Sequence, residues 1–167
     1  DKNTFPGAQG GALNNQIAAK AVCFKEALTK EYQDYSHQIL NNAKALASSF
    51  QEQGLRVVSG GTENHLVLVD TRSVDEELTG KEAGILLNEK GITLNRNSIP
   101  FDPRSPFVTS GIRMGTPAVT TCGMKEDELT QVGYLISEIL KNRLDENRLS
   151  ELEEQVRALA KSFQPYG

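Results

Sequence analysis

A helical stripe of apolar residues in the first third of the chain constrains the fold most. Over residues 31–53 the apolar side chains recur every three or four positions, at Tyr32, Tyr35, Ile39, Ala43, Leu46 and Phe50. This spacing places them on one face of an α-helix, and Gly54 is a natural C-terminal stop. An apolar face of this kind is stable only when other elements cover it, so this helix is expected to lie against the core.

Short segments after this helix have the composition of strands. The stretch LRVVSGG, residues 55–61, predicts a short strand that ends in glycines. The stretch NHLVLVDTR, residues 64–72, is apolar, β-branched and too short for a core helix, so it predicts a buried strand. Two further strands are expected at residues 92–95 and 108–115, on either side of a loop that carries three prolines.

Four more helices are expected, at residues 16–28, at 79–91, from 126 onward and from 150 onward. Thr79 and Glu82 form a capping box at the start of the second of these. Acidic residues 126–128 suit the first turn of the third, where they complement the helix dipole. Ser150 and Glu153 are interpreted as the caps of the last helix, and the Gly-rich residues 1–11 are expected to form a loop.

These elements predict an α+β fold in which a small antiparallel or mixed sheet is covered by helices on one face. The 167 residues are enough for one ordinary domain with a core. The net charge of −4 argues against nucleic acid or an anionic membrane as the main partner. No apolar run approaches the roughly 18 residues of a membrane helix, and the opening stretch DKNTFPGAQGG is not a signal peptide.

The cysteines and histidines exclude several kinds of site. Cys23 and Cys122 lie far apart without metal-like spacing, so two free thiols in a reducing, cytoplasmic compartment are expected. His37 falls on the polar side of the long helix, and His65 begins a strand, where a structural hydrogen bond is expected. No zinc site can be built from these residues, and no serine lies in the elbow motif of a hydrolase.

Arg113 is the most distinctive candidate for a binding residue. It lies in SGIRMGTPAV, residues 110–119, among apolar residues and close to Gly111, Gly115 and Pro117. Glycines allow a backbone to approach another group closely, and a guanidinium held in such a segment can bind a carboxylate with two parallel hydrogen bonds. The alternative is an ordinary solvated arginine on the surface.

Two loops are further candidates. Gly7, Gly10 and Gly11 in FPGAQGG lie just before a helix, where free backbone N–H groups can bind an anion such as phosphate. A plain Gly-rich loop is the alternative. The Pro-rich loop at 97–107 is either functional, as long ordered loops often are, or a simple connection.

The motifs FPGAQGG, VVSGGTENHLVLVD, LTGKEA and GITLNRNSIPFDPRSPFVTSGIRMGTPAVTT, in this order, resemble serine hydroxymethyltransferase from about Phe5 to Met124. The resemblance implies the C-terminal domain of a fold-type-I enzyme that uses pyridoxal 5'-phosphate (PLP). Such an enzyme transfers the hydroxymethyl carbon of serine to tetrahydrofolate, which gives glycine and 5,10-methylenetetrahydrofolate for one-carbon metabolism and glycine biosynthesis.

The resemblance also implies roles for individual residues. Arg113 matches the arginine that binds the substrate carboxylate. Gly10 and Gly11 match the loop that reaches the cofactor phosphate of the neighbouring subunit, so the parent enzyme is expected to be a homodimer or a larger oligomer. The residues that match the folate-binding loops are Asn97, Ser105, Pro106 and Phe107.

Two departures from the family pattern matter. The family continues the glycine pair with Pro and then His, whereas this chain has Ala12 to Gln16 in the order ALNNQ. The family's Schiff-base lysine follows a run of threonines upstream of FPG, and Lys20 lies in a different motif. We therefore expect a C-terminal portion of the enzyme, with residues 1–28 a remnant of the large domain and 29–167 the small domain. No catalytic residue is assigned to this portion, which is expected to bind no PLP and to be inactive alone.

Two other interpretations stay open. A different fold-type-I enzyme, such as a glycine or threonine lyase, would also use Arg113, although the pterin-type loop at 97–107 argues against it. The second is a free-standing domain that is not an enzyme and binds a partner or a carboxylate ligand without a cofactor.

Overall fold

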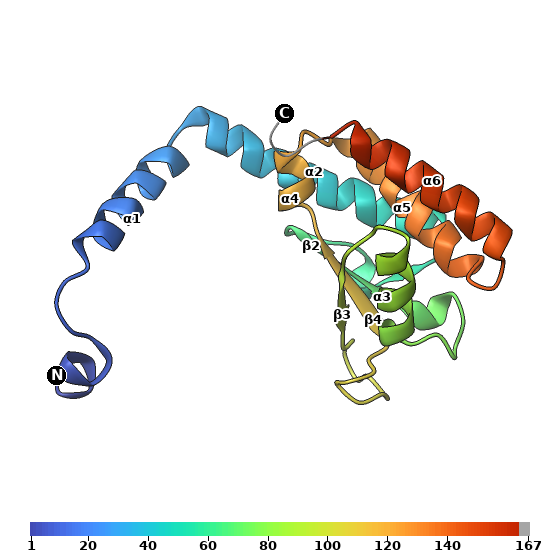
Figure 1. Cartoon of the computed structure of the whole chain (residues 1–167), viewed down its shortest axis with the longest axis horizontal. Coiled ribbons are helices and arrows are strands. Elements are labelled where there is room, and N and C mark those ends of the chain that lie inside the picture. The colour runs from blue at the N-terminus through green and yellow to red at the C-terminus, as the bar shows by residue number, and fades with distance from the viewer. Residues whose placement is uncertain (164–167) are drawn as a thin grey trace. The chain divides into compact units, whose positions relative to one another are not determined.

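A computed structural model describes residues 1–163 of the chain, which separate into two compact units. The first unit is Asp1–Ser36 and the second begins at His37. The first holds an irregular helical turn, η1 (Asn3–Ala8), helix α1 (Asn14–Ala27) and the start of helix α2 (Lys30–Glu52) (Figure 1). The expected division into a large-domain remnant and a small domain after residue 28 stays a prediction.

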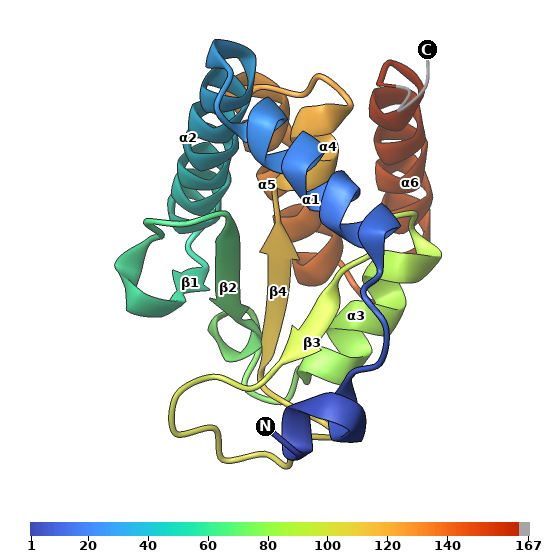
Figure 2. The same ribbon diagram turned by 90° about the vertical axis from the view of Figure 1, so that its left-hand side faces the viewer.

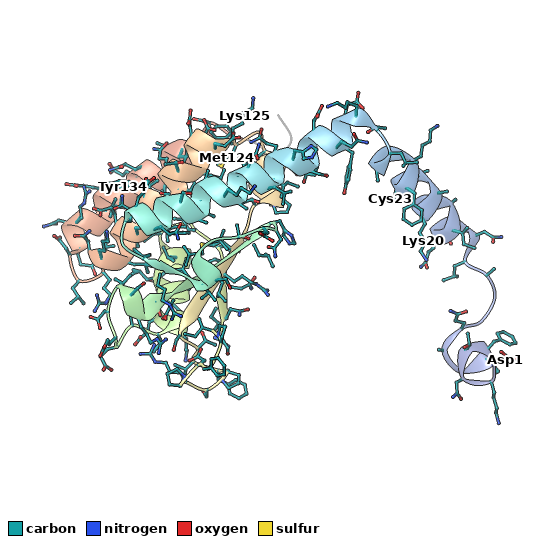
Figure 3. The ribbon with its side chains drawn as sticks, turned by 180° about the vertical axis from the view of Figure 1, so that it is seen from behind. Asp1, Lys20, Cys23, Met124, Lys125 and Tyr134 are labelled. Carbon is teal, nitrogen blue, oxygen red and sulfur yellow. The ribbon has the colours of Figure 1, made fainter. Side chains whose placement is uncertain are left out.

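The first unit buries no side chain of η1 or α1. The predicted helix at 16–28 is present as α1, two residues longer at its start. Residues 1–11, predicted as a loop, include η1, because the backbone N–H groups of Phe5 and Gln9 bond to carbonyls four and five residues earlier. Lys20 and Cys23 both lie on α1 with exposed side chains (Figure 3).

The second unit is built on a four-stranded antiparallel sheet with the strand order β1-β2-β4-β3. The strands are β1 (Arg56–Val57), β2 (Leu66–Asp70), β3 (Asn95–Asn97) and β4 (Gly111–Gly115). The helices after α2 are α3 (Gly80–Glu89), α4 (Pro117–Thr121), α5 (Glu126–Lys141) and α6 (Glu146–Lys161). Two short 3-10 turns, η2 (Val58–Gly60) and η3 (Thr71–Ser73), follow β1 and β2.

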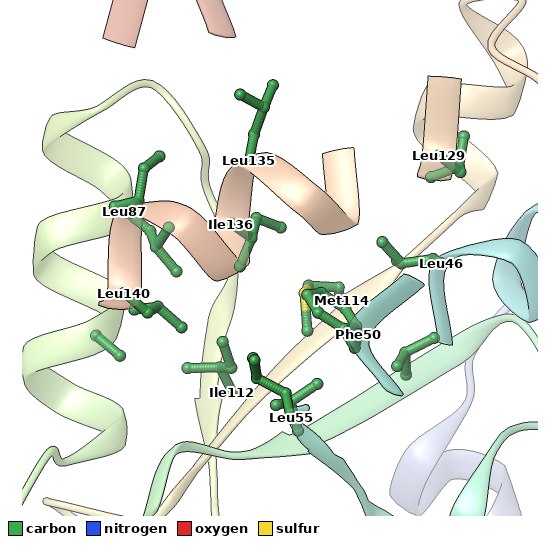
Figure 4. Packing of buried hydrophobic residues seen from close by; sticks show 14 of the residues in the cluster. Leu46, Phe50, Leu55, Leu87, Ile112, Met114, Leu129, Leu135, Ile136 and Leu140 are labelled. Atoms are coloured by element: carbon green, nitrogen blue, oxygen red, sulfur yellow. The ribbon is translucent and has the colours of Figure 1, made fainter. Parts of the chain in front are cut away.

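Within the described part of the second unit, α2, α3, α5 and α6 pack on one face of this sheet, and the core lies between the two layers (Figure 2). Alternate residues of the central strands point into it: Val67 and Val69 from β2, and Ile112 and Met114 from β4. They join one apolar cluster with residues of α2, α3, α5 and α6, among them Leu46, Phe50, Leu87, Leu135, Ile136 and Leu140 (Figure 4). The predicted α+β fold, with helices on one face of a small sheet, is confirmed.

The boundaries of several elements differ from those predicted. The strand expected at 92–95 lies at Asn95–Asn97, because these three residues pair with β4. Only Arg56 and Val57 of the stretch 55–61 pair as a strand before η2 begins. Helix α4 was not predicted, although Pro117 at its first turn is a recognised start signal.

The capping predictions had opposite outcomes. The box at α3 is confirmed, because Thr79 Oγ1 accepts from the Glu82 N–H and the Glu82 carboxylate accepts from the Thr79 N–H. The caps predicted for the last helix were wrong. Asp145 is the N-cap of α6 and accepts from the Arg148 N–H, so Ser150 lies inside the helix and donates to the Glu146 carbonyl.

The start of α3 lies directly against the segment that leads into β4. The backbone N–H groups of Gly80 and Lys81 donate to the carbonyls of Thr109 and Val108, both at 3.0 Å. A Cβ atom on Gly80 would lie 2.3 Å from Thr109 Oγ1 and 2.4 Å from the Gly111 carbonyl oxygen. Only glycine fits this contact without moving backbone.

Replacing Gly80 with alanine is therefore expected to destabilise the second unit. We predict that Gly80→Ala lowers the free energy of unfolding by about 2 kcal/mol or more, because the new methyl group overlaps backbone. Gly84→Ala is the matched control on the same helix, since its Cβ would meet only Leu94 Cδ1 at 4.0 Å. It should raise the free energy of unfolding by up to about 1 kcal/mol. Urea unfolding of both variants measures this, and an equal effect of the two would contradict the close contact.

Candidate functional site

Arg113 lies on the open face of the sheet, in the middle of the strand β4. It pairs with Leu68 of β2 and with Asn95 of β3, and directly paired residues of antiparallel strands share a face. Its neighbours Ile112 and Met114 are buried on the opposite face, so the alternation of the strand directs Arg113 away from the core. Arg113, the predicted binding residue, is thus held on a strand, and its side chain is exposed to solvent.

Arg113 has no partner of its own. Its side chain makes no hydrogen bond or ion pair within residues 1–163, whereas Arg56, Arg72 and Arg104 are all bonded to acidic groups or carbonyls. A guanidinium with five free donors can bind a planar anion without first breaking another contact.

A hollow of about 930 Å³ opens beside Arg113. Its walls come from the outer side of α2, from η2 with the turn that follows, and from the open face of β2. The lining is mostly polar and includes Lys44, Ser48, Gln51, Ser59, Thr62, Glu63, Asn64 and Arg113. The hollow is large enough for a small polar ligand, and Arg113 is the one guanidinium among the described residues that line it.

The two glycines that flank Arg113, Gly111 and Gly115, differ in how closely other atoms approach them. Both lie two residues from Arg113 and so share its face of the sheet, which leaves no side chain beside the guanidinium along β4 itself. Gly111 is also required by packing, because a Cβ there would lie 2.7 Å from the Asn97 carbonyl oxygen and 2.8 Å from Ile99 Cγ2. Gly115 is less restricted, since the nearest atom, Leu66 Cδ2, would be 3.3 Å away. The close backbone approach expected from the sequence is found at Gly111.

The predicted folate-loop residues lie at one end of the same sheet. Asn97 ends β3 opposite Gly111, on the face that carries Arg113, and its amide donates to the Ser98 carbonyl at 2.7 Å. Ser105, Pro106 and Phe107 belong to the loop of residues 98–110, which connects β3 with β4, and all three are exposed. The structure thus joins Asn97 and Arg113 through adjacent strands and attaches the loop to both.

Asp102 organises the 98–110 loop and was missed by the sequence analysis. One carboxylate oxygen accepts from the backbone N–H groups of Ile99 (3.2 Å) and Ser110 (2.8 Å). The other accepts from the Arg104 N–H (2.9 Å) and the Ser110 hydroxyl (2.7 Å). Burial alone would raise the pKa of Asp102, but these hydrogen bonds together lower it to about 2. The Asp-Pro pair within a turn was the available signal, because an aspartate often accepts from the N–H two residues on.

A second acidic group, Asp70 at the end of β2, is buried and paired with arginines of the same chain. Its carboxylate accepts from the Arg56 guanidinium at 2.7 Å and from the Arg72 guanidinium at 2.8 Å. Burial would raise the pKa of Asp70, but the bonds to Arg72 and Arg56 lower it below its usual value. Because each arginine is committed to Asp70, we regard this cluster as structural.

Gly10 and Gly11 lie in the first unit, between η1 and α1. Both are exposed, and a Cβ on either would have no atom within 4 Å. The altered run of residues 12–16 forms the approach to α1 and its first residues, and the N-cap, Leu13, has no side-chain hydrogen bond. The backbone here is thus accessible for an anion, and its contacts with one stay a prediction.

The described residues contain no metal-binding group of three or more His, Cys, Asp or Glu side chains. None of the helices within residues 1–163 is long and apolar enough to cross a membrane. His37 and His65 are both exposed; the backbone carbonyl of His65 accepts from the Thr116 N–H, and a structural hydrogen bond of the His65 side chain stays a prediction.

The fold and the site define a class of protein: a small α+β domain that presents, beside a hollow, an arginine whose side chain has no partner among residues 1–163. The family follows from a comparison with protein-family models, in which the serine hydroxymethyltransferase model matches residues 1–136. The chain belongs to the serine hydroxymethyltransferase family, and the resemblance seen in the sequence is confirmed. Full-length members of this family are PLP-dependent transferases.

The residues around the hollow do not form a PLP site by themselves. Among the described residues that line it, Lys44 is the only amine, and no aromatic ring is available to stack on a pyridine. The donor set fits a carboxylate rather than the cofactor.

The pKa of Asp102 predicts how the stability of the second unit depends on pH. Because the pKa is about 2 in the folded chain and near 3.8 when unfolded, the unfolded state binds more protons between these values. The stabilisation by Asp102 is therefore complete above about pH 4 and is lost as the pH falls towards 2. We predict that Asp102→Asn lowers Tm at neutral pH and that its difference from wild type disappears by about pH 2.

Thermal unfolding over this pH range measures the effect. Asp127→Asn is the control, because Asp127 is exposed in the first turn of α5 and makes no side-chain hydrogen bond with a described residue. It should shift Tm little at any pH. A difference between Asp102→Asn and wild type that is the same at pH 2 and pH 7 would contradict the prediction.

Proposed function

We propose that this chain is the C-terminal part of a serine hydroxymethyltransferase, which interconverts serine and glycine with tetrahydrofolate and 5,10-methylenetetrahydrofolate. The observation that carries the proposal is the exposed, unpaired guanidinium of Arg113 on the open face of the sheet, in a chain of this family. The parent enzyme is proposed to act in the cytoplasm.

Arg113 is proposed to bind the α-carboxylate of serine or glycine. Its planar fork can donate two parallel hydrogen bonds to the two carboxylate oxygens. The strand fixes the guanidinium stem, and the bidentate contact then fixes the orientation of the substrate's Cα substituents. Each charge-assisted bond of this kind contributes about 1.5–3 kcal/mol.

Asn97 and the residues 105–107 are proposed to line the folate site. Phe107 is 79% exposed, so its ring is free to pack on a flat heterocycle. Asn97 offers an amide oxygen and an N–H group to the edge of such a ring. Their attachment to β3 and β4 supports the idea that folate and the amino acid bind on neighbouring parts of one sheet.

PLP supplies an electron sink when it is bound in the full-length enzyme. We propose that its Schiff-base lysine, its ring-stacking histidine and its pyridine-nitrogen partner belong to the upstream part of the protein. The chain alone is then inactive and forms no stable PLP adduct. Gly10 and Gly11 are proposed to reach the cofactor phosphate of a neighbouring subunit, and the exposed apolar side chains of α1, among them Ile17, Val22 and Phe24, support a role in assembly.

Arg113→Lys tests the carboxylate contact in the full-length enzyme. Lysine keeps the charge but cannot offer the planar pair of donors. We predict a tenfold to several-hundredfold loss in kcat/KM for serine, on the order expected for a lost charge-assisted bond, with PLP binding and Tm nearly unchanged. Arg96→Lys is the matched control, because Arg96 is exposed on the next strand and pairs with Ile112, on the face opposite to Arg113.

Steady-state kinetics with serine, together with the PLP absorption spectrum, gives the answer. Near-normal kinetics of a correctly folded, PLP-loaded Arg113→Lys enzyme would refute the carboxylate contact. Cleavage of threonine without any stimulation of serine turnover by tetrahydrofolate would favour a glycine or threonine lyase instead.

The proposed exchange between subunits predicts complementation. If Gly11 serves the neighbour's cofactor while Arg113 serves its own subunit's site, a weakened Arg113→Lys enzyme and a weakened Gly11→Asp enzyme should regain activity when mixed. One site of each hybrid dimer then has both residues intact. The aspartate is chosen because its charge repels a phosphate. Mixed subunits that regain no activity, although sedimentation shows that hybrids form, would contradict the exchange.

A further inference from the structure

We propose that Asp102 is a positioning residue for folate, because it closes the 98–110 loop into the shape that presents Ser105 and Phe107. The inference rests on the proposed function and deepens it, since Asp102 itself is not expected to touch the ligand.

The contacts of Asp102 join the two ends of the loop. Its carboxylate holds the N–H of Ile99, near the start of the loop, together with the N–H and hydroxyl of Ser110, at its end. These two residues are eleven positions apart in the chain, so a single side chain turns a long connection into a closed ring. The fourth bond, from the Arg104 N–H, fixes the turn that leads to Ser105.

The outer part of the loop is fastened separately. Arg104 donates from its two terminal nitrogens to the carbonyls of Leu78 (2.8 Å) and Glu76 (2.5 Å), just before α3. The carbonyls of Thr109 and Val108 accept hydrogen bonds from the backbone N–H groups of Gly80 and Lys81, at the start of α3. Backbone bonds to the carbonyls of Ile99 and Ser105 form two local turns within the loop. Asp102 is the side chain that joins the two ends of the loop across these turns.

The backbone next to Asp102 is unusual in a way that this arrangement explains. Phe101 and Thr109 both have positive φ angles, of 56° and 61°, which non-glycine residues adopt only at a cost. Phe101 is fully exposed, so no packing of its ring stabilises that conformation. The carboxylate bonds from the Ile99 and Arg104 N–H groups fix the backbone on either side of Phe101, whereas Thr109 is held by its own N–H bond to the Ser105 carbonyl. The rings of Phe101 and Phe107 both lie in solvent, where a flat ligand can reach them.

The Asp102 carboxyl group stays ionised under physiological conditions. Because the pKa of Asp102 is about 2, the group is a carboxylate with all its acceptor sites at neutral pH. Asparagine at this position has the same shape, but its NH2 group faces two donors and cannot accept from either. The Asp102→Asn variant therefore opens the ring with the least change in volume.

The test is steady-state kinetics of the full-length enzyme with Asp102→Asn, Ser110→Ala and the control Asp127→Asn. We expect Asp102→Asn to raise KM for tetrahydrofolate roughly tenfold or more, with KM for serine and the PLP spectrum unchanged. Ser110→Ala removes one of the four bonds and should give a smaller rise in the same direction. Asp127→Asn should match wild type.

The other possible outcomes refute either the positioning role of Asp102 or the proposed function. A Tm loss with normal KM for tetrahydrofolate would make Asp102 only a stabilising residue, and an equal rise of both KM values would mean general collapse of the site. Either would refute the inference and leave the proposed function intact. If Asp102→Asn does not fold, Ser110→Ala decides by the same criteria. Serine turnover by wild type that is independent of tetrahydrofolate would instead refute the proposed function, and this inference with it.

Discussion

The burial of one face of β4 is the constraint on which the rest of the structure depends. Ile112 and Met114 are buried in the core between the sheet and the helices, and the two-residue period of a strand then leaves Arg113 no place but the open face. A slip of one residue in the register would put a charge into the core and two apolar side chains into solvent. The hydrophobic effect thus fixes the position of the guanidinium without any polar contact to hold it.

The connection between β3 and β4 completes the site by a different kind of interaction. Ile99 is its only buried apolar side chain among the described residues, and hydrogen bonds to Asp102 and to the start of α3 hold its two ends. Gly80 permits the hydrogen bonds between the loop and the start of α3, because a side chain at this position would overlap Thr109. The site proposed for the amino acid therefore relies on the core, whereas the site proposed for folate relies on a polar network at the end of the sheet.

The sequence could predict those features that depend on local patterns. Periodicity identified α2 and α5, and the short apolar run identified β2, because burial imposes a regular spacing on residues close in the chain. The unusual setting of Arg113 was also visible. The role of Gly80 was not, since it depends on Thr109 and Gly111, about 30 residues away, which it meets only in the folded chain. For Asp102 only the bond to Arg104 had a local signal, since the bonds to Ser110 span eight residues of an irregular loop. The start of α6 was misplaced because the prediction put the cap at Ser150, whereas Asp145, five residues earlier, caps the helix.

The central claim is that Arg113 binds the substrate carboxylate from the open face of the sheet. A crystal structure of the full-length protein with PLP and glycine tests it most directly. We predict that both carboxylate oxygens of glycine accept hydrogen bonds from the Arg113 guanidinium, at about 2.7–2.9 Å. A glycine carboxylate bound by other groups, with Arg113 still facing solvent, would contradict it.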